Sequence, residues 1–192
     1  VKMLKIALTG NIASGKSSVQ LFLEEKSYPV IDTDIVCHEL LENSVEIAEA
    51  FSEYDVFHDG ILSREKLGQL VFSDPKLKKM LENLLYPDLI AEIQAFFAVH
   101  SDSKLVFVGI PQLFEAGMEN LFDRTILVYC DDKIREQRLI ARNKYTKEYA
   151  QIRMKSQLSQ DIKAKKVDYI IYNNSTMDDL HSNIIKVIEQ IR

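Results

Sequence analysis

Short apolar runs alternate along the chain with longer stretches in which apolar residues recur at helical spacing. The apolar runs lie at residues 4–9, 28–31, 105–110, 125–129 and 169–172. Runs that are largely apolar, rather than apolar at every second position, are typical of parallel strands covered on both faces. Strands that alternate with helices predict an α/β fold, with helices packed on both faces of a parallel sheet in three layers.

The middle of the chain has a different pattern. Residues 43–100 contain no run suited to a buried strand, and their clearest signals are helix starts. Ser63 is suited to begin one helix, and Asp74 followed by Pro75 begins a stronger one. Pro87 predicts that this second helix breaks or kinks. We therefore expect a helical lobe at about residues 43–100, inserted into the α/β core.

One motif carries a specific chemistry. Residues 10–17 form a complete G-x-x-x-x-G-K-S sequence between the first apolar run and a helical segment, which is the setting of a phosphate-binding loop. Backbone N–H groups of the loop and helix N-terminus bind phosphate oxygens, Lys16 reaches the β- and γ-phosphates, and the Ser17 hydroxyl ligates Mg²⁺. The motif therefore predicts a nucleoside triphosphate site. Its expected contacts are Asn11, Ile12, Ala13, Ser14, Gly15, Lys16, Ser17 and Ser18.

Acidic residues follow the second apolar run. Because ligands bind beyond the carboxyl ends of parallel strands, Asp32 and Asp34 are expected at the same edge of the sheet as the phosphate loop. Phosphoryl transfer needs a group that accepts the proton of the attacking hydroxyl, and we assign that role to Asp34. If the chain is extended there, both carboxylates lie on one side and can share Mg²⁺ and its waters. Asp34 is equally suited to cap the helix that follows, and the two roles can coexist.

The third apolar run lacks the acid that many nucleotide-hydrolysing proteins carry at this place. No Asp closes residues 105–110, and the next acid is Glu115, at the end of the segment Pro111-Gln112-Leu113-Phe114-Glu115. The missing carboxylate counts against a motor or switch NTPase. Glu115 is either a substitute magnesium ligand or a solvated loop residue.

A strongly basic segment runs from Arg135 to Lys166. Within it, Arg138 and Arg142 are four residues apart and therefore share one helical face. Basic helices near a phosphate loop suggest a lid, at about residues 142–166, that closes over the nucleotide, supplies positive charge and excludes water. The alternative is a solvated basic surface.

The composition narrows the class of protein. The chain has 192 residues and a net charge of −5, which argues against a general nucleic-acid binder. No apolar stretch approaches the roughly 18 residues that span a membrane. Cys37 and Cys130 are too few and too far apart for a disulfide framework, and the histidines have no metal-ligand spacing. We expect one cytoplasmic domain over residues 1–192, without a signal peptide and without nucleic-acid or membrane partners; the oligomeric state stays open.

The motifs together resemble the dephospho-coenzyme A kinase family, in order along essentially the whole chain. The matching segments are residues 8–17, 30–34, 59–64, 71–72, 111–115, 137–142 and 167–173. The resemblance implies a P-loop kinase fold with a helical substrate lobe and a helical lid. It also implies ATP with Mg²⁺ as phosphoryl donor and the ribose 3′-hydroxyl of dephospho-coenzyme A as acceptor, in the last step of coenzyme A biosynthesis.

The resemblance also implies roles for individual residues. Asp34 corresponds to the general base for the 3′-hydroxyl, Arg142 to the lid arginine on the ATP side with Arg138 beside it, and Arg64 to part of the acceptor site. The chain departs from the family pattern at Asn11, Ala13, Tyr86 and Gln112. We expect Lys16, Asp34 and Arg142 to be catalytic, Asp32, Asp34 and Arg64 to bind the acceptor, Arg138 and Arg142 to bind ATP, and Ser17 and Asp32 to hold Mg²⁺.

Two other functions are weighed against this one. The first is another small-molecule kinase of the same fold, acting on a nucleoside, nucleotide or shikimate-like acceptor. The second is a switch that hydrolyses a nucleotide and signals to a partner. A guanine-reading N-K-x-D motif is absent, since residues 143–146 read N-K-Y-T. Dependence of nucleotide turnover on an acceptor separates either kinase from the switch.

Overall fold

The computed structural model describes residues 2–191, and the contacts among them divide the chain after residues 31 and 99. Residues 2–31 and 100–191 form one unit, which we call the sheet unit, and Asp32–Val99 form the other, the helical unit. No helix within residues 2–191 is long and apolar enough to cross a membrane.

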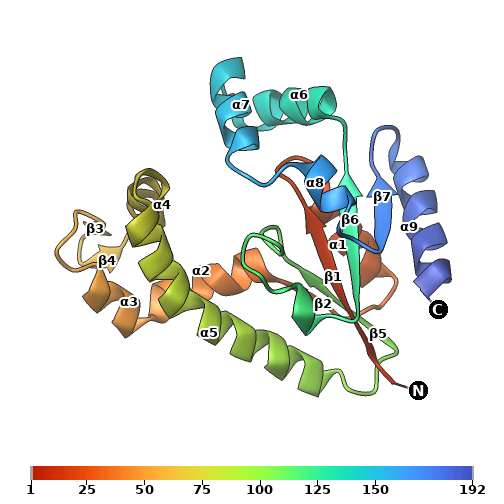
Figure 1. Ribbon diagram of the computed structural model, residues 1–192, viewed down its shortest axis with the longest axis horizontal. Helices are drawn as coiled ribbons and strands as arrows, with labels where there is room; N and C mark the ends of the chain where they lie inside the picture. The colour runs from red at the N-terminus through yellow and green to blue at the C-terminus, as the bar shows by residue number, and fades with distance from the viewer. Residues whose placement is uncertain (1, 192) are drawn as a thin grey trace. The chain divides into compact units, whose positions relative to one another are not determined.

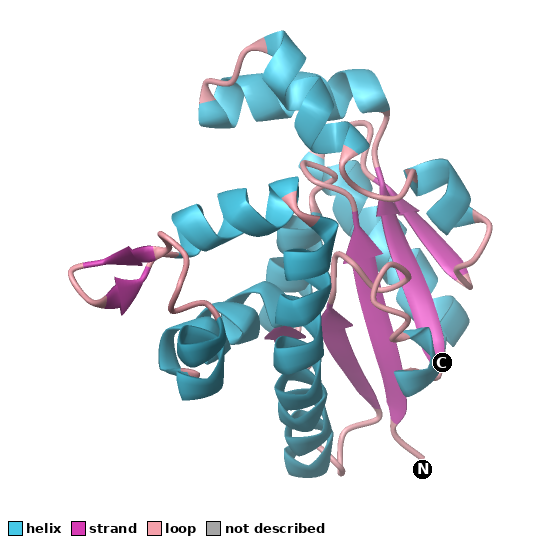
Figure 2. Cartoon of the chain, turned by 60° about the vertical axis from the view of Figure 1, so that its left-hand side comes forward, coloured by secondary structure: helices cyan, strands magenta, loops and turns pink. Residues whose placement is uncertain are grey.

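The sheet is parallel and has five strands in the order β2-β5-β1-β6-β7 (Figures 1 and 2). Helices connect the strands, as a parallel arrangement requires. The predicted α/β fold with a parallel sheet is confirmed. Its strands are β1 (Leu4–Gly10), β2 (Val30–Asp32), β5 (Leu105–Gly109), β6 (Arg124–Tyr129) and β7 (Tyr169–Tyr172). The helices of the sheet unit are α1 (Lys16–Glu25), η1 (Glu119–Leu121), α6 (Asp132–Asn143), α7 (Lys147–Lys155), α8 (Gln160–Ala164) and α9 (Met177–Ile191).

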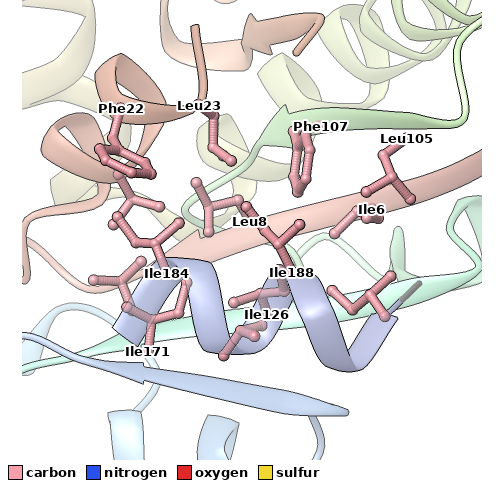
Figure 3. Close-up of a cluster of buried hydrophobic side chains, with 14 of the residues drawn as sticks. Ile6, Leu8, Phe22, Leu23, Leu105, Phe107, Ile126, Ile171, Ile184 and Ile188 are labelled. Carbon is pink, nitrogen blue, oxygen red and sulfur yellow. The ribbon is translucent and has the colours of Figure 1, made fainter. Parts of the chain in front are cut away.

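The core of the sheet unit lies where α1 and α9 pack on one face of the sheet (Figure 3). Ile6 and Leu8 of β1 point to this face, whereas Ala7 between them is also fully buried. Burial of successive residues explains why the strands read as apolar runs rather than alternating ones. Leu23 of α1 and Ile184 of α9 close the cluster. Each large side chain buried in this way stabilises the fold by about 1.5–3 kcal/mol.

The helical unit is built around one long helix. Its elements are α2 (Thr33–Asn43), α3 (Val45–Ala50), β3 (Phe57–His58), β4 (Ile61–Leu62), α4 (Arg64–Ser73) and α5 (Pro75–Val99). α5 continues through Pro87, so the expected break at this residue is wrong. Proline removes one N–H donor, but Leu85 and Leu89 on either side of it are buried, and this packing outweighs the lost hydrogen bond.

A short hairpin in the helical unit was not predicted from the sequence. β3 and β4 pair antiparallel over two residues each, with Asp59 and Gly60 between them. Both turn residues have positive φ, 50° and 79°, as a tight hairpin turn requires. The strands are too short to form a buried sheet, which agrees with the largely helical character expected for this region.

Candidate active site

The phosphate loop connects β1 to α1 and owes its shape to two left-handed residues. Ala13 has a φ of 62° and Gly15, the N-cap of α1, has a φ of 97°. The N–H of Ser14 donates to the carbonyl of Asn11 at 2.9 Å, which closes the loop. A Cβ at Gly15 would collide with Nδ2 of Asn173, so glycine is required both by conformation and by space.

The interior of the loop offers groups suited to a phosphate. Lys16 is nearly buried, and its Nζ lies 2.9 Å from Oε1 of Gln20. Ser14 is fully buried, and its Oγ has no hydrogen-bond partner among the described residues. The first N–H groups of α1 have no helical carbonyl to accept them, and the helix dipole adds positive potential at the same place. These residues fit a nucleotide's phosphates, and Ser17 is exposed at the first turn of α1, where a hydroxyl can reach Mg²⁺.

Residues of the basic segment form hydrogen bonds with Asn11 and Ile12 of the phosphate loop. Nε of Arg135 on α6 donates to the carbonyl of Ile12 at 3.0 Å, and Oε1 of Gln157 accepts the N–H of Ile12 at 2.8 Å. Nδ2 of Asn11 donates to the carbonyl of Leu158 at 2.9 Å. The backbone groups of Ile12 are thus already engaged, and this residue shapes the loop through them.

Arg138, which was expected on the ATP side, does lie at the phosphate loop. Its Nη2 donates to the carbonyl of Asn173 at 3.3 Å, and its Nη1 lies 3.4 Å from Sγ of Cys130. The side chain of Asn173 in turn donates to the carbonyl of Ser14 at 2.8 Å. Arg142 lies one turn further along α6, is exposed, and donates from Nε to Oδ1 of Asn143 at 2.9 Å.

Glu115 is partly exposed, as expected of a loop residue, but its side chain is held in defined contacts. Its Oε1 lies 3.0 Å from Nζ of Lys163 and accepts the N–H of Leu158 at 3.1 Å. Lys163 is fully buried and also donates to the carbonyl of Pro111 at 2.8 Å. Burial lowers the pKa of the Lys163 ammonium, and the interaction with Glu115 opposes that shift.

The acidic pair belongs to the helical unit, and its geometry differs from the expected one. Asp32 is the N-cap of α2 and accepts the N–H of Asp34 at 2.9 Å, so Asp34 is not the cap. Because helical geometry begins at Thr33, the chain between the two carboxylates is not extended, and that ground for a shared ion is wrong. Burial, followed by the charges of Asp34 and Asp32, raises the pKa of the Cys37 thiol to about 11.

Two further features bear on the expected ligands. Arg64 is the first residue of α4, half-exposed, with Nε 3.9 Å from Oε1 of Glu42. Within residues 2–191, no cluster of three or more His, Cys, Asp or Glu is arranged to hold a metal ion. A magnesium ion that takes most of its ligands from phosphates and water needs no such cluster.

Sequence reasoning missed several residues that contact the phosphate loop or the strand ends. Arg135 and Lys163 were counted only as members of the basic segment and were given no individual role, yet they are 3% and 0% exposed. Gln157 belonged to no motif. Asn173 ended the family-like segment 167–173 but was given no role, although it directly follows β7, at the strand end where ligand-binding residues collect.

Comparison with known proteins gives one consistent family. Residues 4–179 match the family described as dephospho-CoA kinase. A dephospho-CoA kinase of Listeria innocua is 34% identical over 96% of each chain. Among solved structures, a protein from Thermus thermophilus covers 100% of both chains with a TM-score of 0.89 and 32% identity. A dephospho-CoA kinase from Campylobacter jejuni gives a TM-score of 0.73 with 31% identity, over 97% of this chain and 96% of its own.

Proposed function

Since the chain belongs to the dephospho-CoA kinase family, we propose that it transfers the γ-phosphoryl group of ATP to the ribose 3′-hydroxyl of dephospho-coenzyme A. The product is coenzyme A, and the reaction is the last step of its biosynthesis. The observation that carries the proposal is the phosphate loop of residues 10–17, with its left-handed Gly15 and the arginine that reaches its rim.

The sheet unit is proposed to bind ATP. Lys16 and the N–H groups at the start of α1 hold the β- and γ-phosphates, and Arg138 adds positive charge at the rim of the loop. Arg142, exposed on the same helix, is available to bind the nucleotide when the lid of residues 142–166 closes. Ser17 and Asp32 are the proposed ligands of Mg²⁺, which would supply positive charge to neutralise the transferred group.

The helical unit is proposed to bind the acceptor. Its residues 43–99 are proposed as the lobe that receives dephospho-coenzyme A, and Arg64 is a half-exposed cation suited to an anionic group of that substrate. Asp34 is the proposed general base, because its carboxylate is exposed at the first turn of α2. It accepts the proton of the 3′-hydroxyl as the oxygen attacks phosphorus.

The proposed substrates bear on the compartment and the partners of the enzyme. Both are small molecules, and we propose that the enzyme works on them in the cytoplasm without nucleic-acid or membrane partners. Cys37 and Cys130 are both free thiols, as in a reducing compartment.

The reaction is tested by ADP release from ATP and Mg²⁺ with dephospho-coenzyme A, adenosine, AMP, shikimate or no acceptor. Stimulation by dephospho-coenzyme A alone, with phosphate on the 3′-oxygen of the product, is the expected result. Stimulation by another acceptor instead would keep the kinase fold and refute the substrate. Turnover without any acceptor would favour the nucleotide-hydrolysing switch.

Asp34 is tested with a variant matched for helix position. Asp34→Asn should retain ATP binding and lose about 10²–10⁴-fold in kcat, which is the usual contribution of a general base. Asp178→Asn is the control, because Asp178 is likewise the second residue of an exposed helix start, in α9. Both substitutions weaken the interaction of a carboxylate with a helix dipole to the same extent. A loss of kcat that occurs only in Asp34→Asn therefore reports a catalytic role of Asp34. Wild-type kcat in Asp34→Asn would remove Asp34 from the role.

A further inference from the structure

Asn173 is a buried polar residue that the proposed reaction does not yet use. It directly follows β7 and is 5% exposed. Its own N–H donates to the carbonyl of Tyr129 at 2.8 Å, which continues the pairing of β7 with β6 by one residue. Hydrogen bonding in the sheet therefore holds the backbone of Asn173 in place, which also fixes the starting point of its side chain.

The side chain of Asn173 reaches the phosphate loop. Nδ2 donates to the carbonyl of Ser14 at 2.8 Å in a buried hydrogen bond. The amide orientation is determined by this contact, because a carbonyl can only accept. Nδ2 also occupies the space that a Cβ would take at Gly15, so it lies directly against the residue whose left-handed conformation starts α1.

The backbone of Asn173 holds the arginine of the same site. Its carbonyl accepts Nη2 of Arg138 at 3.3 Å, and Nη1 of this arginine lies within 3.8 Å of the Cβ position at Gly15. One residue, attached to the end of the edge strand β7, thus contacts both the turn of the phosphate loop and the cation that reaches its rim.

We propose that Asn173 is a positioning residue for phosphoryl transfer, which aligns the Ser14-Gly15 turn and Arg138 on the phosphates of ATP. This inference rests on the proposed function only in that the loop binds ATP. Asn173 acts through the loop and the arginine rather than by touching the transferred group. A preorganised loop binds phosphate without having to be ordered first, so loss of Asn173 weakens ATP more than it weakens the acceptor.

The test compares Asn173→Ala with Asn174→Ala. Asn174 is the matched control, since its side chain also joins two segments, with Nδ2 3.0 Å from Oδ1 of Asp131 and Oδ1 accepting the N–H of Asp131, but it is exposed. Asn173→Ala should raise the KM for ATP about tenfold, the usual effect of one buried hydrogen bond. The KM for the acceptor should stay within about twofold of the wild-type value, and Asn174→Ala should change neither.

A second variant keeps the test informative if alanine disturbs folding. Asn173→Asp is nearly the same size but cannot donate to the Ser14 carbonyl when ionised, and it places a negative charge against the loop. It should weaken ATP more than Asn173→Ala does. Binding of a non-hydrolysable ATP analogue, measured by calorimetry, gives the same order without any acceptor.

The outcomes separate the inference from the proposed function. Weaker binding of the analogue in both Asn173 variants supports the positioning role even if dephospho-coenzyme A proves not to be the acceptor. Equal rises in the KM values of ATP and acceptor, or a lower thermal midpoint with unchanged analogue affinity, would show a purely structural residue and overturn the inference.

Discussion

The ion pair between the buried Lys163 and the partly exposed Glu115 makes a sharp prediction about stability. Lys163 is fully buried, whereas the Glu115 side chain is 22% exposed. Glu115→Ala therefore leaves a buried ammonium whose remaining partner among residues 2–191 is the Pro111 carbonyl. Removal of one partner of a buried pair costs about 3–5 kcal/mol, and the remaining carbonyl and partial exposure place this variant near about 3 kcal/mol. For a chain of this length that corresponds to a thermal midpoint lowered by about 6–12 °C.

The reverse substitution should cost less. Lys163→Met removes the buried charge and fills its space with an apolar side chain of similar length. Glu115 can then turn toward water, and the Pro111 carbonyl still accepts the hydroxyl of Thr9 at 3.1 Å. The expected loss is about 1 kcal/mol, that of a typical hydrogen bond. Calorimetric unfolding of both variants measures the two losses of stability. If Lys163→Met proved less stable than Glu115→Ala, the reasoning would be refuted.

The same pair gives a dependence on pH. Burial lowers the pKa of Lys163, so between that lowered value and the ordinary value near 10 the unfolded chain binds more protons than the folded one. Stability attributable to Lys163 therefore rises with pH across this window. Because Glu115 opposes the shift, its removal lowers the pKa further, and the deficit of Glu115→Ala should shrink between pH 7 and pH 9.5. A deficit that is constant or grows would contradict this assignment.

Two further predictions concern the phosphate loop and the acidic pair. Gly15→Ala should lose ATP-analogue binding and about 1–2 kcal/mol of stability, because φ at Gly15 is 97° and the added Cβ would meet Asn173. Gly68→Ala is the control: Gly68 lies in a helix with no atom within 4 Å of the added Cβ, so this variant should be neutral or stabilising in the same assays. Cys37 has a pKa raised from 9.0 to about 11, so at pH 8 it should be alkylated about 100-fold more slowly than an ordinary thiol. Alkylation should be faster in Asp34→Asn, because a negative charge that raises the pKa is removed. Mass spectrometry follows both reactions, and alkylation of Cys37 at the rate of a free peptide thiol would refute the burial argument.

The fold followed from the sequence because its signals are local. Successive residues of β1, β5 and β6 are buried, so their apolar runs indicate these strands directly, and the apolar run at residues 169–172 coincides with β7. Pro87 misled because its local effect, one lost N–H, is smaller than the burial of the helix around it. The cap of α2 misled for a similar reason: Asp32 and Asp34 are both good cap residues, and the end of β2 at Asp32 decided between them.

The side chains of the site were harder to predict, because charge alone does not reveal burial. Lysine and arginine are exposed by default, and composition gave no reason to treat Lys163 or Arg135 otherwise. Their partners lie far away in the sequence: Glu115 is 48 residues before Lys163, and Ile12 is 123 residues before Arg135. Only the three-dimensional arrangement brings such groups together.

The ends of the strands nevertheless indicate more of the residues at the site than the sequence motifs do. Residues at or just past the carboxyl ends of β1, β5, β6 and β7 share one edge of the parallel sheet. These residues are Asn11, Pro111, Cys130 and Asn173, and each takes part in a contact described above: with Leu158, Lys163, Arg138 and Ser14, respectively. Only Asn11 belongs to the phosphate-loop motif. Once a parallel sheet is predicted, the residues just past its strand ends are therefore candidates for positioning the loop, beside the charged residues chosen for their chemistry.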